Sequence, residues 1–254
     1  MEKQVLWTER VRVKSYEVDA SGRLSFRALF NLFQEVAGQH ATHLGVGFEA
    51  LRQHDLFWVL SRIRVDIVRM PAWREDIAIA TWPKGVERLF ALRDFRMLDR
   101  DGALLVNGST GWLLLDSIRY RPKSIGTLPE RVPLNAHEHA IGAPLEKIIP
   151  PAGLAPVGEV LVRYSDLDVN NHVNNARYPE WIIDACAADG HERSISSLQI
   201  NYLEEAREGD TIGLLAGPLA GAADTTYAEG ISRNRDAKIF QSRFTWQPAV
   251  SRDA

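Results

Sequence analysis

The chain has 254 residues, of which 45% are apolar and 25% are charged, and its net charge is −3. This balance is typical of a globular protein, and the length allows one large domain or two of ordinary size. The only cysteine excludes an intramolecular disulfide and favours a reducing compartment. No apolar run approaches the roughly 18 residues of a membrane span, and the first residues lack an apolar signal core. We therefore expect a cytoplasmic protein without a membrane span.

The charge is divided unevenly along the chain. Residues 1–135 hold 20 basic and 16 acidic residues, whereas residues 136–254 hold 10 and 17. The imbalance indicates two domains and an acidic partner for the first, and a chance surface composition accounts for it equally well. Nucleic acid is not the expected partner, because the net charge is negative and no basic aromatic motif is present.

Taken in chain order, the first half predicts one strand, one long helix and four further strands. Residues 5–13 alternate as a strand does, and residues 24–44 carry an apolar stripe at helical spacing. Runs rich in β-branched and aromatic residues follow, separated by Gly, Pro and charged turns. They predict strands at 57–68, 77–82, 90–98 and 104–115.

The second half repeats this order after a proline-rich connection. Seven prolines fall between Arg121 and Gly158, and such a run resists both sheet and helix interiors. We expect an ordered crossover there. Beyond it, residues 159–164 predict a strand and residues 175–188 a helix. The last strands are predicted at 195–202, 211–215, 225–232 and 239–246.

The two halves form an internal repeat. The segment from Val11 to Asp19 matches the segment from Val160 to Asp168, at an offset of 149 positions. A repeat of this length predicts a duplicated domain rather than a solenoid. Each copy must bury its helix stripe on the apolar face of its antiparallel sheet, which predicts an α+β fold. The expected parts are an N-terminal module at 1–135, a crossover at 136–157 and a C-terminal module at 158–254.

The stretch from Arg163 to Trp181 carries the densest chemistry. Two readings fit it equally well. One is an Asx turn followed by a helix cap. The other is a site in which helix N–H groups hold an oxyanion while a histidine and a carboxylate activate water. The polar side chains concerned are Asp166, Asp168, Asn170, Asn171, His172, Asn174 and Asn175.

Other chemistries fail on the spacing. A calcium loop needs Gly at its sixth position and Glu at its twelfth, where this chain has Asn171 and Arg177. Zinc needs three or four ligands, and only Asp168 and His172 are at hand. No nucleophilic-serine elbow is present. Cys186 lies among alanines and is more typical of a buried apolar side chain. We expect neither a metal nor a cofactor.

The string SDLDVNNHVNNARYPEW, from Ser165 to Trp181, resembles the signature of the acyl-ACP thioesterases. The resemblance covers most of the chain, as two modules and a linker. It implies a tandem double hot-dog fold, in which a long helix is wrapped by an antiparallel sheet twice. It also implies hydrolysis of fatty acyl-ACP to free fatty acid and holo-ACP, with acyl carrier protein as partner, and it allows a homodimer.

The resemblance also assigns residues one at a time. It places the catalytic Asp, Asn and His on Asp168, Asn170 and His172. The family's glutamate, about thirty residues on in INYLEEAREGD, falls on Glu205, with Glu204 as the alternative.

Two departures from the family pattern matter. Plant members often carry cysteine at the position of Ala206, so a cysteine nucleophile cannot operate there and an activated water is implied. The corresponding turn of the first module keeps Asp19 but lacks the asparagine and the histidine. This implies one active and one degenerate module.

Binding residues are also expected. The N–H groups near Val173 and Asn174 would polarise the thioester carbonyl. The acyl chain is expected in the first module, although apolar stripes are more often plain core. The side chains expected to line its site are Phe30, Phe33, Phe57, Trp58 and Trp112. Candidates for meeting an acidic carrier are Arg62, Arg64, Arg69, Lys84 and Arg88.

Three alternative functions remain open at this point. An acyl-CoA thioesterase would use the same chemistry on another carrier. A hydratase or dehydratase on the same fold would release no thiol. A non-catalytic acyl-binding protein would retain its ligand without turnover, and it would leave the turn from Asp168 to His172 unexplained.

Overall fold

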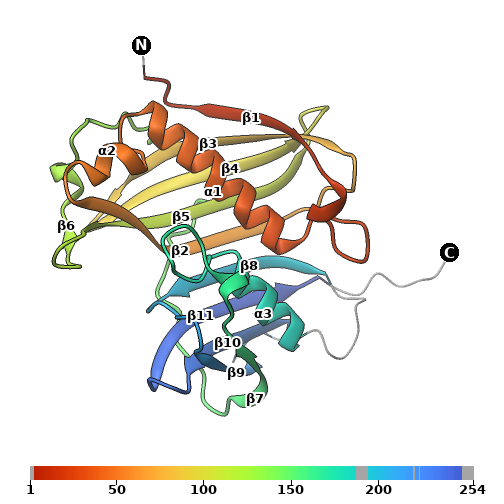
Figure 1. Ribbon diagram of the computed structural model, residues 1–254. Helices are drawn as coiled ribbons and strands as arrows, with labels where there is room; N and C mark the ends of the chain where they lie inside the picture. The colour runs from red at the N-terminus through yellow and green to blue at the C-terminus, as the bar shows by residue number, and fades with distance from the viewer. Residues whose placement is uncertain (1–2, 187–193, 220, 223, 248–254) are drawn as a thin grey trace. The chain divides into compact units, whose positions relative to one another are not determined.

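A computed structural model of the chain describes residues 3–186, 194–219, 221–222 and 224–247. They fall into two compact units, Met1–Leu145 (the first unit) and Glu146–Ala254 (the second unit). In each unit a helix, long in the first unit and shorter in the second, lies across a face of an antiparallel sheet (Figure 1). Among the described residues, no helix has the length and apolar character needed to cross a membrane.

The first unit contains a sheet with the strand order β1-β3-β4-β5-β2, and the short strand β6 pairs with β5. Every pairing in it is antiparallel. Its helices and strands are β1 (Trp7–Arg12), α1 (Phe26–His43), α2 (Phe48–Arg52), β2 (Leu56–Ile67), β3 (Asp76–Glu87), β4 (Phe90–Asp99), β5 (Leu104–Asp116) and β6 (Pro122–Lys123).

The helix α1 begins where Ser25 accepts a hydrogen bond from the N–H of Ala28, and its apolar stripe faces the sheet. Phe33 is 1% exposed and stacks on Phe95 with 4.5 Å between ring centroids. Gly108 permits this packing, because a Cβ at that position would lie 2.4 Å from the Phe33 ring. The helix is therefore fixed on the sheet by a close aromatic contact over a glycine.

The second unit repeats the same connectivity. Its strand order is β7-β9-β10-β11-β8, which matches that of the first unit element by element. Its elements are β7 (Ala155–Leu161), α3 (Arg177–Cys186), β8 (Ile195–Tyr202), β9 (Thr211–Pro218), β10 (Thr225–Ser232) and β11 (Ala237–Trp246).

The predicted order of strand, helix and four strands is confirmed in both halves. Two elements were not predicted, α2 and β6. The predicted strand at 77–82 runs on to Glu87, because the ladder tolerates Pro83 through a register shift between Pro83 and Gly85. The second helix ends at Cys186, and residues 187–188 of its predicted span lie outside the described residues.

The proline-rich segment from 128 to 154 contains no helix or strand. Side chains of the strands hold it through its main-chain carbonyls. In the first unit, Trp82 Nε1 donates to the carbonyl of Glu138 (3.0 Å) and Lys84 Nζ to that of Ile141 (2.6 Å). In the second unit, Gln199 Nε2 donates to the carbonyl of Glu146 (2.7 Å). The segment is thus ordered by side chains rather than by a ladder of its own.

A polar pair lies beneath α1 in the first unit. His40 is fully buried, its Nε2 is 2.9 Å from the carbonyl of Gln4, and its Nδ1 is 2.9 Å from Arg93 Nη1. A guanidinium can only donate, so Nδ1 accepts and the neutral ring donates from Nε2. Burial, together with the nearby charge of Arg93, lowers the pKa of His40 from 6.5 to about 4.

This pair predicts a loss of stability in acid. The unfolded chain protonates this histidine near pH 6.5, whereas the folded chain resists protonation down to about pH 4. The free energy of unfolding should therefore fall by about 3 kcal/mol as the pH drops through that window. Denaturant titrations from pH 7.5 to 4 measure it. The variant His40→Gln should lack this part of the pH dependence, and an unchanged profile in the variant would contradict the assignment.

Candidate active site

The polar loop, residues 163–177, joins β7 to α3 and is closed by Asp168. The Oδ1 of Asp168 accepts hydrogen bonds from the N–H groups of Asn170 (2.8 Å) and His172 (3.3 Å). The main-chain N–H of Asp168 donates to the carbonyl of His172 (2.7 Å), and Asn171 takes a left-handed φ of 62°. Asp168 therefore holds the turn that presents the ring of His172.

Asp166 ties the two ends of the polar loop together. Its buried carboxylate accepts hydrogen bonds from the N–H of Arg163 (2.8 Å) and from Arg177 Nε (2.7 Å). Its carbonyl accepts from the N–H of Asn174 (2.9 Å). Because Arg177 is the first residue of α3, this anchor fixes the helix start to the strand end.

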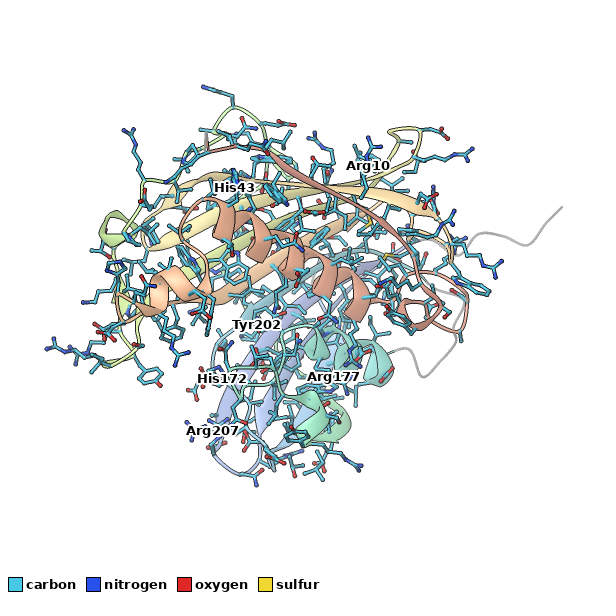
Figure 2. All side chains as sticks on the ribbon, turned by 45° about the horizontal axis from the view of Figure 1, so that its top comes forward. Arg10, His43, His172, Arg177, Tyr202 and Arg207 are labelled. Atoms are coloured by element: carbon cyan, nitrogen blue, oxygen red, sulfur yellow. The ribbon has the colours of Figure 1, made fainter. Side chains whose placement is uncertain are left out.

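The ring of His172 meets Glu205, whose loop (residues 203–210) joins β8 to β9. His172 Nε2 lies 3.4 Å from Glu205 Oε2, and the two side chains are 39% and 45% exposed. Glu204 points elsewhere, 3.7 Å from Arg235. Figure 2 shows His172 and Arg207 of the 203–210 loop at the same end of the second unit. A base and a carboxylate are thus paired where water can reach them.

The first unit contains the same turn in its own sequence. The Oδ1 of Asp19 accepts from the N–H groups of Ser21 (2.8 Å) and Arg23 (3.3 Å), and the N–H of Asp19 donates to the carbonyl of Arg23 (2.8 Å). Gly22, with a φ of 75°, takes the place of Asn171. The bonds match those of the second unit at the predicted offset of 149 positions.

The loop of Glu205 also has a counterpart in the first unit. In the first unit the loop after β2 starts with two N–H groups, those of Val68 and Arg69, that both donate to the carbonyl of Leu105. In the second unit the loop after β8 starts in the same way, with two N–H groups that both donate to the carbonyl of Ile239. This shared pattern aligns Glu205 with Met70.

Both units bring these two loops into contact. In the first unit, Arg23 Nη1 donates to the carbonyl of Met70 (3.2 Å). In the second unit, the equivalent positions are His172 and Glu205. The fold therefore brings the two loops together in both units, and only the second unit has an acid and a base at the positions that meet.

The two main-chain donors expected to polarise a carbonyl differ. The N–H of Asn174 is occupied by the carbonyl of Asp166, so the expectation that it faces a substrate is wrong. The side chain of Asn174 instead accepts a hydrogen bond from the N–H of Ala176 (2.9 Å), in the turn just before α3. The N–H of Val173 has no hydrogen-bond acceptor within the described part of the chain, and Val173 itself is 4% exposed.

The remaining residues of the predicted site take different positions. The side chain of Asn170 is exposed and forms no hydrogen bond with the described residues. Ala206 is 1% exposed. Burial raises the pKa of the Cys186 thiol to about 11, which keeps it a neutral thiol at pH 7.

Sequence reasoning missed the groups that support the site. The anchor between Asp166 and Arg177 was not predicted, although the acid is part of the string that carries the family resemblance. Tyr202 was also missed, and its hydroxyl donates to the carbonyl of Asn175 (3.0 Å), just before α3 (Figure 2). A tyrosine in a strand gives no sign in the sequence that its hydroxyl reaches the start of a helix.

The apolar residues expected to bind the acyl chain lie in several environments. Phe30 and Phe33 are buried side chains of α1. Trp58 Nε1 donates to the carbonyl of Val46 (3.0 Å), and Trp112 Nε1 donates to Thr110. Phe57 precedes Trp58 in β2, so the two side chains point to opposite faces of the sheet. Their role in binding stays a prediction.

Most of the basic residues named for a carrier have partners inside the first unit. Arg62 donates to the carbonyl of Leu145. The other contacts are ion pairs of Arg64 with Asp66 (3.0 Å), Arg69 with Glu75 (2.7 Å) and Lys84 with Asp94 (3.2 Å). These side chains serve the unit's own packing. Nowhere in the described ranges do three or more His, Cys, Asp or Glu side chains gather in a way that could hold a metal ion.

Comparisons with known proteins now bear on this arrangement. Family models for the acyl-ACP thioesterase N-terminal and C-terminal domains match residues 4–127 and 155–248. The chain belongs to the acyl-ACP thioesterase family. The resemblance inferred from the polar loop is therefore confirmed.

Solved structures confirm the fold. An acyl-ACP thioesterase from Bacteroides thetaiotaomicron is 25% identical, covers 95% of this chain and 98% of its own, and superposes with a TM-score of 0.80. The 12:0-ACP thioesterase from Umbellularia californica is 22% identical over 96% of this chain and 98% of its own, with a TM-score of 0.77, and supports the fold alone. The predicted tandem double hot-dog is the observed α+β architecture.

Curated relatives in the acyl-ACP thioesterase family are longer than this chain. A chloroplastic acyl-[acyl-carrier-protein] hydrolase from Cuphea viscosissima is 23% identical over 96% of this chain. A chloroplastic oleoyl-acyl carrier protein thioesterase from Arabidopsis thaliana is 28% identical over 82% of it. The aligned part spans 63% of the length of each relative.

The anchor of the polar loop predicts a large stability cost on removal of its acid. Asp166→Ala would leave Arg177 without its buried partner and should lower the free energy of unfolding by about 3–5 kcal/mol. Chemical denaturation followed by circular dichroism and by total tryptophan fluorescence measures it. Glu159→Ala is the matched control, since it breaks an exposed pair with Arg233 and should cost about 0–1 kcal/mol. Equal costs for both variants would contradict a buried anchor.

Proposed function

We propose that this protein hydrolyses the thioester of fatty acyl groups carried on acyl carrier protein, giving free fatty acid and the carrier thiol. The observation that carries the proposal is the contact of His172 with Glu205, 3.4 Å apart and open to solvent, in a member of the acyl-ACP thioesterase family. The same contact favours Glu205 over Glu204 as the acid.

In the proposed reaction, His172 and Glu205 bind a water molecule and remove its proton as it attacks the thioester carbon. The carbon–sulfur bond then breaks, and the proton passes to the leaving thiolate. The N–H of Val173, which has no acceptor among the described residues and follows His172 in the chain, is the donor we assign to the developing oxyanion. Asp168 holds the turn, and we assign the orientation of the water to the exposed side chain of Asn170, which belongs to the same turn. Ala206 leaves no nucleophile beside Glu205.

For the first unit we propose a binding role without chemistry. Its equivalent positions hold Arg23 and Met70, which cannot act as a general base on water. The face of its sheet covered by α1 is the proposed site for the acyl chain, with Phe30, Phe33, Trp58 and Trp112 as candidates. Phe57, on the opposite face, has the weakest claim.

The test is release of free thiol from a panel of acyl-ACPs of different chain length and from the same acyl-CoAs. Glu205→Gln and His172→Ala should each lower kcat/KM for acyl-ACP by a factor on the order of 10²–10⁴, because each removes a group that activates water. Glu204→Gln should change it less than about threefold, since that side chain faces Arg235 rather than His172.

Each rival function gives a different result in this panel. Faster turnover of acyl-CoA than of acyl-ACP would identify the protein as an acyl-CoA thioesterase. Conversion of enoyl thioesters without thiol release would identify a hydratase. Tight acyl binding with no product would identify a binding protein. Near-normal hydrolysis in both Glu205→Gln and His172→Ala would contradict the assigned residues.

A further inference from the structure

An arginine from a turn distant in sequence forms hydrogen bonds with the loop that carries Glu205. Arg235 lies in the turn between β10 and β11, and its Nη2 donates to the main-chain carbonyl of Glu205 (2.6 Å). The same nitrogen donates to Oδ2 of Asp210 (2.8 Å), and Nη1 lies 3.7 Å from Glu204. One guanidinium thus contacts both ends of the 203–210 loop.

The carboxylate that receives Arg235 is itself firmly placed. Asp210 is 5% exposed, and its side chain also accepts the N–H of Arg207 (3.0 Å). Its carbonyl accepts the N–H of Val162, at the end of β7 (2.9 Å). Arg235 therefore connects the main chain of Glu205 to a buried carboxylate at the start of β9.

The first unit provides an internal comparison. Its counterpart of Asp210 is Glu75, whose carbonyl accepts the N–H of Val13 in the same way (2.9 Å). Glu75 is paired with Arg69 (2.7 Å), a residue of its own loop. The position of Arg69 corresponds to Glu204 in the second unit, so the second unit has an acid there.

This exchange of charges has a consequence for the second unit. With Glu204 in place of an arginine, the 203–210 loop has no basic side chain at that position to meet Asp210. The cation comes instead from the β10–β11 turn, and it reaches the carbonyl of Glu205 as well. The arrangement occurs in the unit that carries the His172–Glu205 pair.

We propose that Arg235 is a positioning residue that holds Glu205 beside His172, an inference that rests on the proposed function. Arg235 does not touch the reacting atoms; it fixes the main chain from which the Glu205 carboxylate projects. A displacement of that carboxylate by about 1 Å can cost on the order of 10²-fold in rate.

The test uses Arg235→Met with Arg233→Met as the matched control. Arg233 lies two residues earlier in the same turn, is exposed and forms an ion pair with the exposed Glu159 (3.1 Å). Arg235→Met should lower kcat by roughly 10–100-fold with KM changed less than about threefold, and Arg233→Met should change neither. Arg235→Lys should recover only part of the rate, because an ammonium cannot span both acceptors.

Two further measurements separate positioning from a general structural role. In a Glu205→Gln background, Arg235→Met should cause no further loss of kcat, because Arg235 acts through Glu205. Multiplying losses would contradict this. The second measurement is the ring resonance of His172 in the NMR spectrum of the whole protein at fixed pH.

The NMR measurement also distinguishes failure of this inference from failure of the proposed function, since it needs no turnover. Arg235→Met should move the His172 resonance in the same direction as Glu205→Gln, and Arg233→Met should leave it in place. If Glu205→Gln moves the resonance and Arg235→Met does not, the positioning role is wrong, whatever reaction the protein catalyses.

Discussion

The chemistry of this protein depends on a constraint of backbone pairing. In each unit the first strand pairs with the third in chain order, β1 with β3 and β7 with β9. The hydrogen bonds from Val13 to Glu75 and from Val162 to Asp210 close these pairs at the same place. The loop leaving the first strand toward the helix must therefore lie against the loop entering the third strand. This contact between the loops follows from the strand pairing and does not depend on which side chains the loops carry.

The duplication shows how little of the turn geometry depends on catalysis. Asp19 and Asp168 each accept hydrogen bonds from the N–H groups two and four residues further along the chain. Both turns also contain a residue with left-handed backbone, Gly22 in the first unit and Asn171 in the second. Because the backbone supplies the turn, the side chains at its tip are free to diverge. In the second unit two buried carboxylates are paired with arginines, Asp166 with Arg177 in the polar loop and Asp210 with Arg235 beside it, whereas the first unit has the more exposed Glu75–Arg69 pair. Buried pairs of this kind stabilise little in net terms, and they hold one geometry.

Sequence reasoning reached the order of elements, the duplication and the residues at the tip of the polar loop. The order of elements and the duplication follow from periodicity and local turn chemistry, as the match of Asp19 to Asp168 illustrates, whereas the roles of the residues at the tip came from the family resemblance. It could not reach contacts between residues distant in sequence. The assignment of Glu205 over Glu204 depends on which way two neighbouring side chains point. The N–H of Asn174 was misjudged because its acceptor, the carbonyl of Asp166, is a main-chain group that has no sequence signature.

In the proposed reaction, His172 and Glu205 act as one unit on a water molecule. A double-mutant cycle on kcat/KM for acyl-ACP hydrolysis tests it most directly, with His172→Ala, Glu205→Gln and the double variant compared with the parent protein. The double variant should be about as slow as the slower of the two single variants. Losses that multiply in the double variant would contradict it, because they would show two residues acting independently.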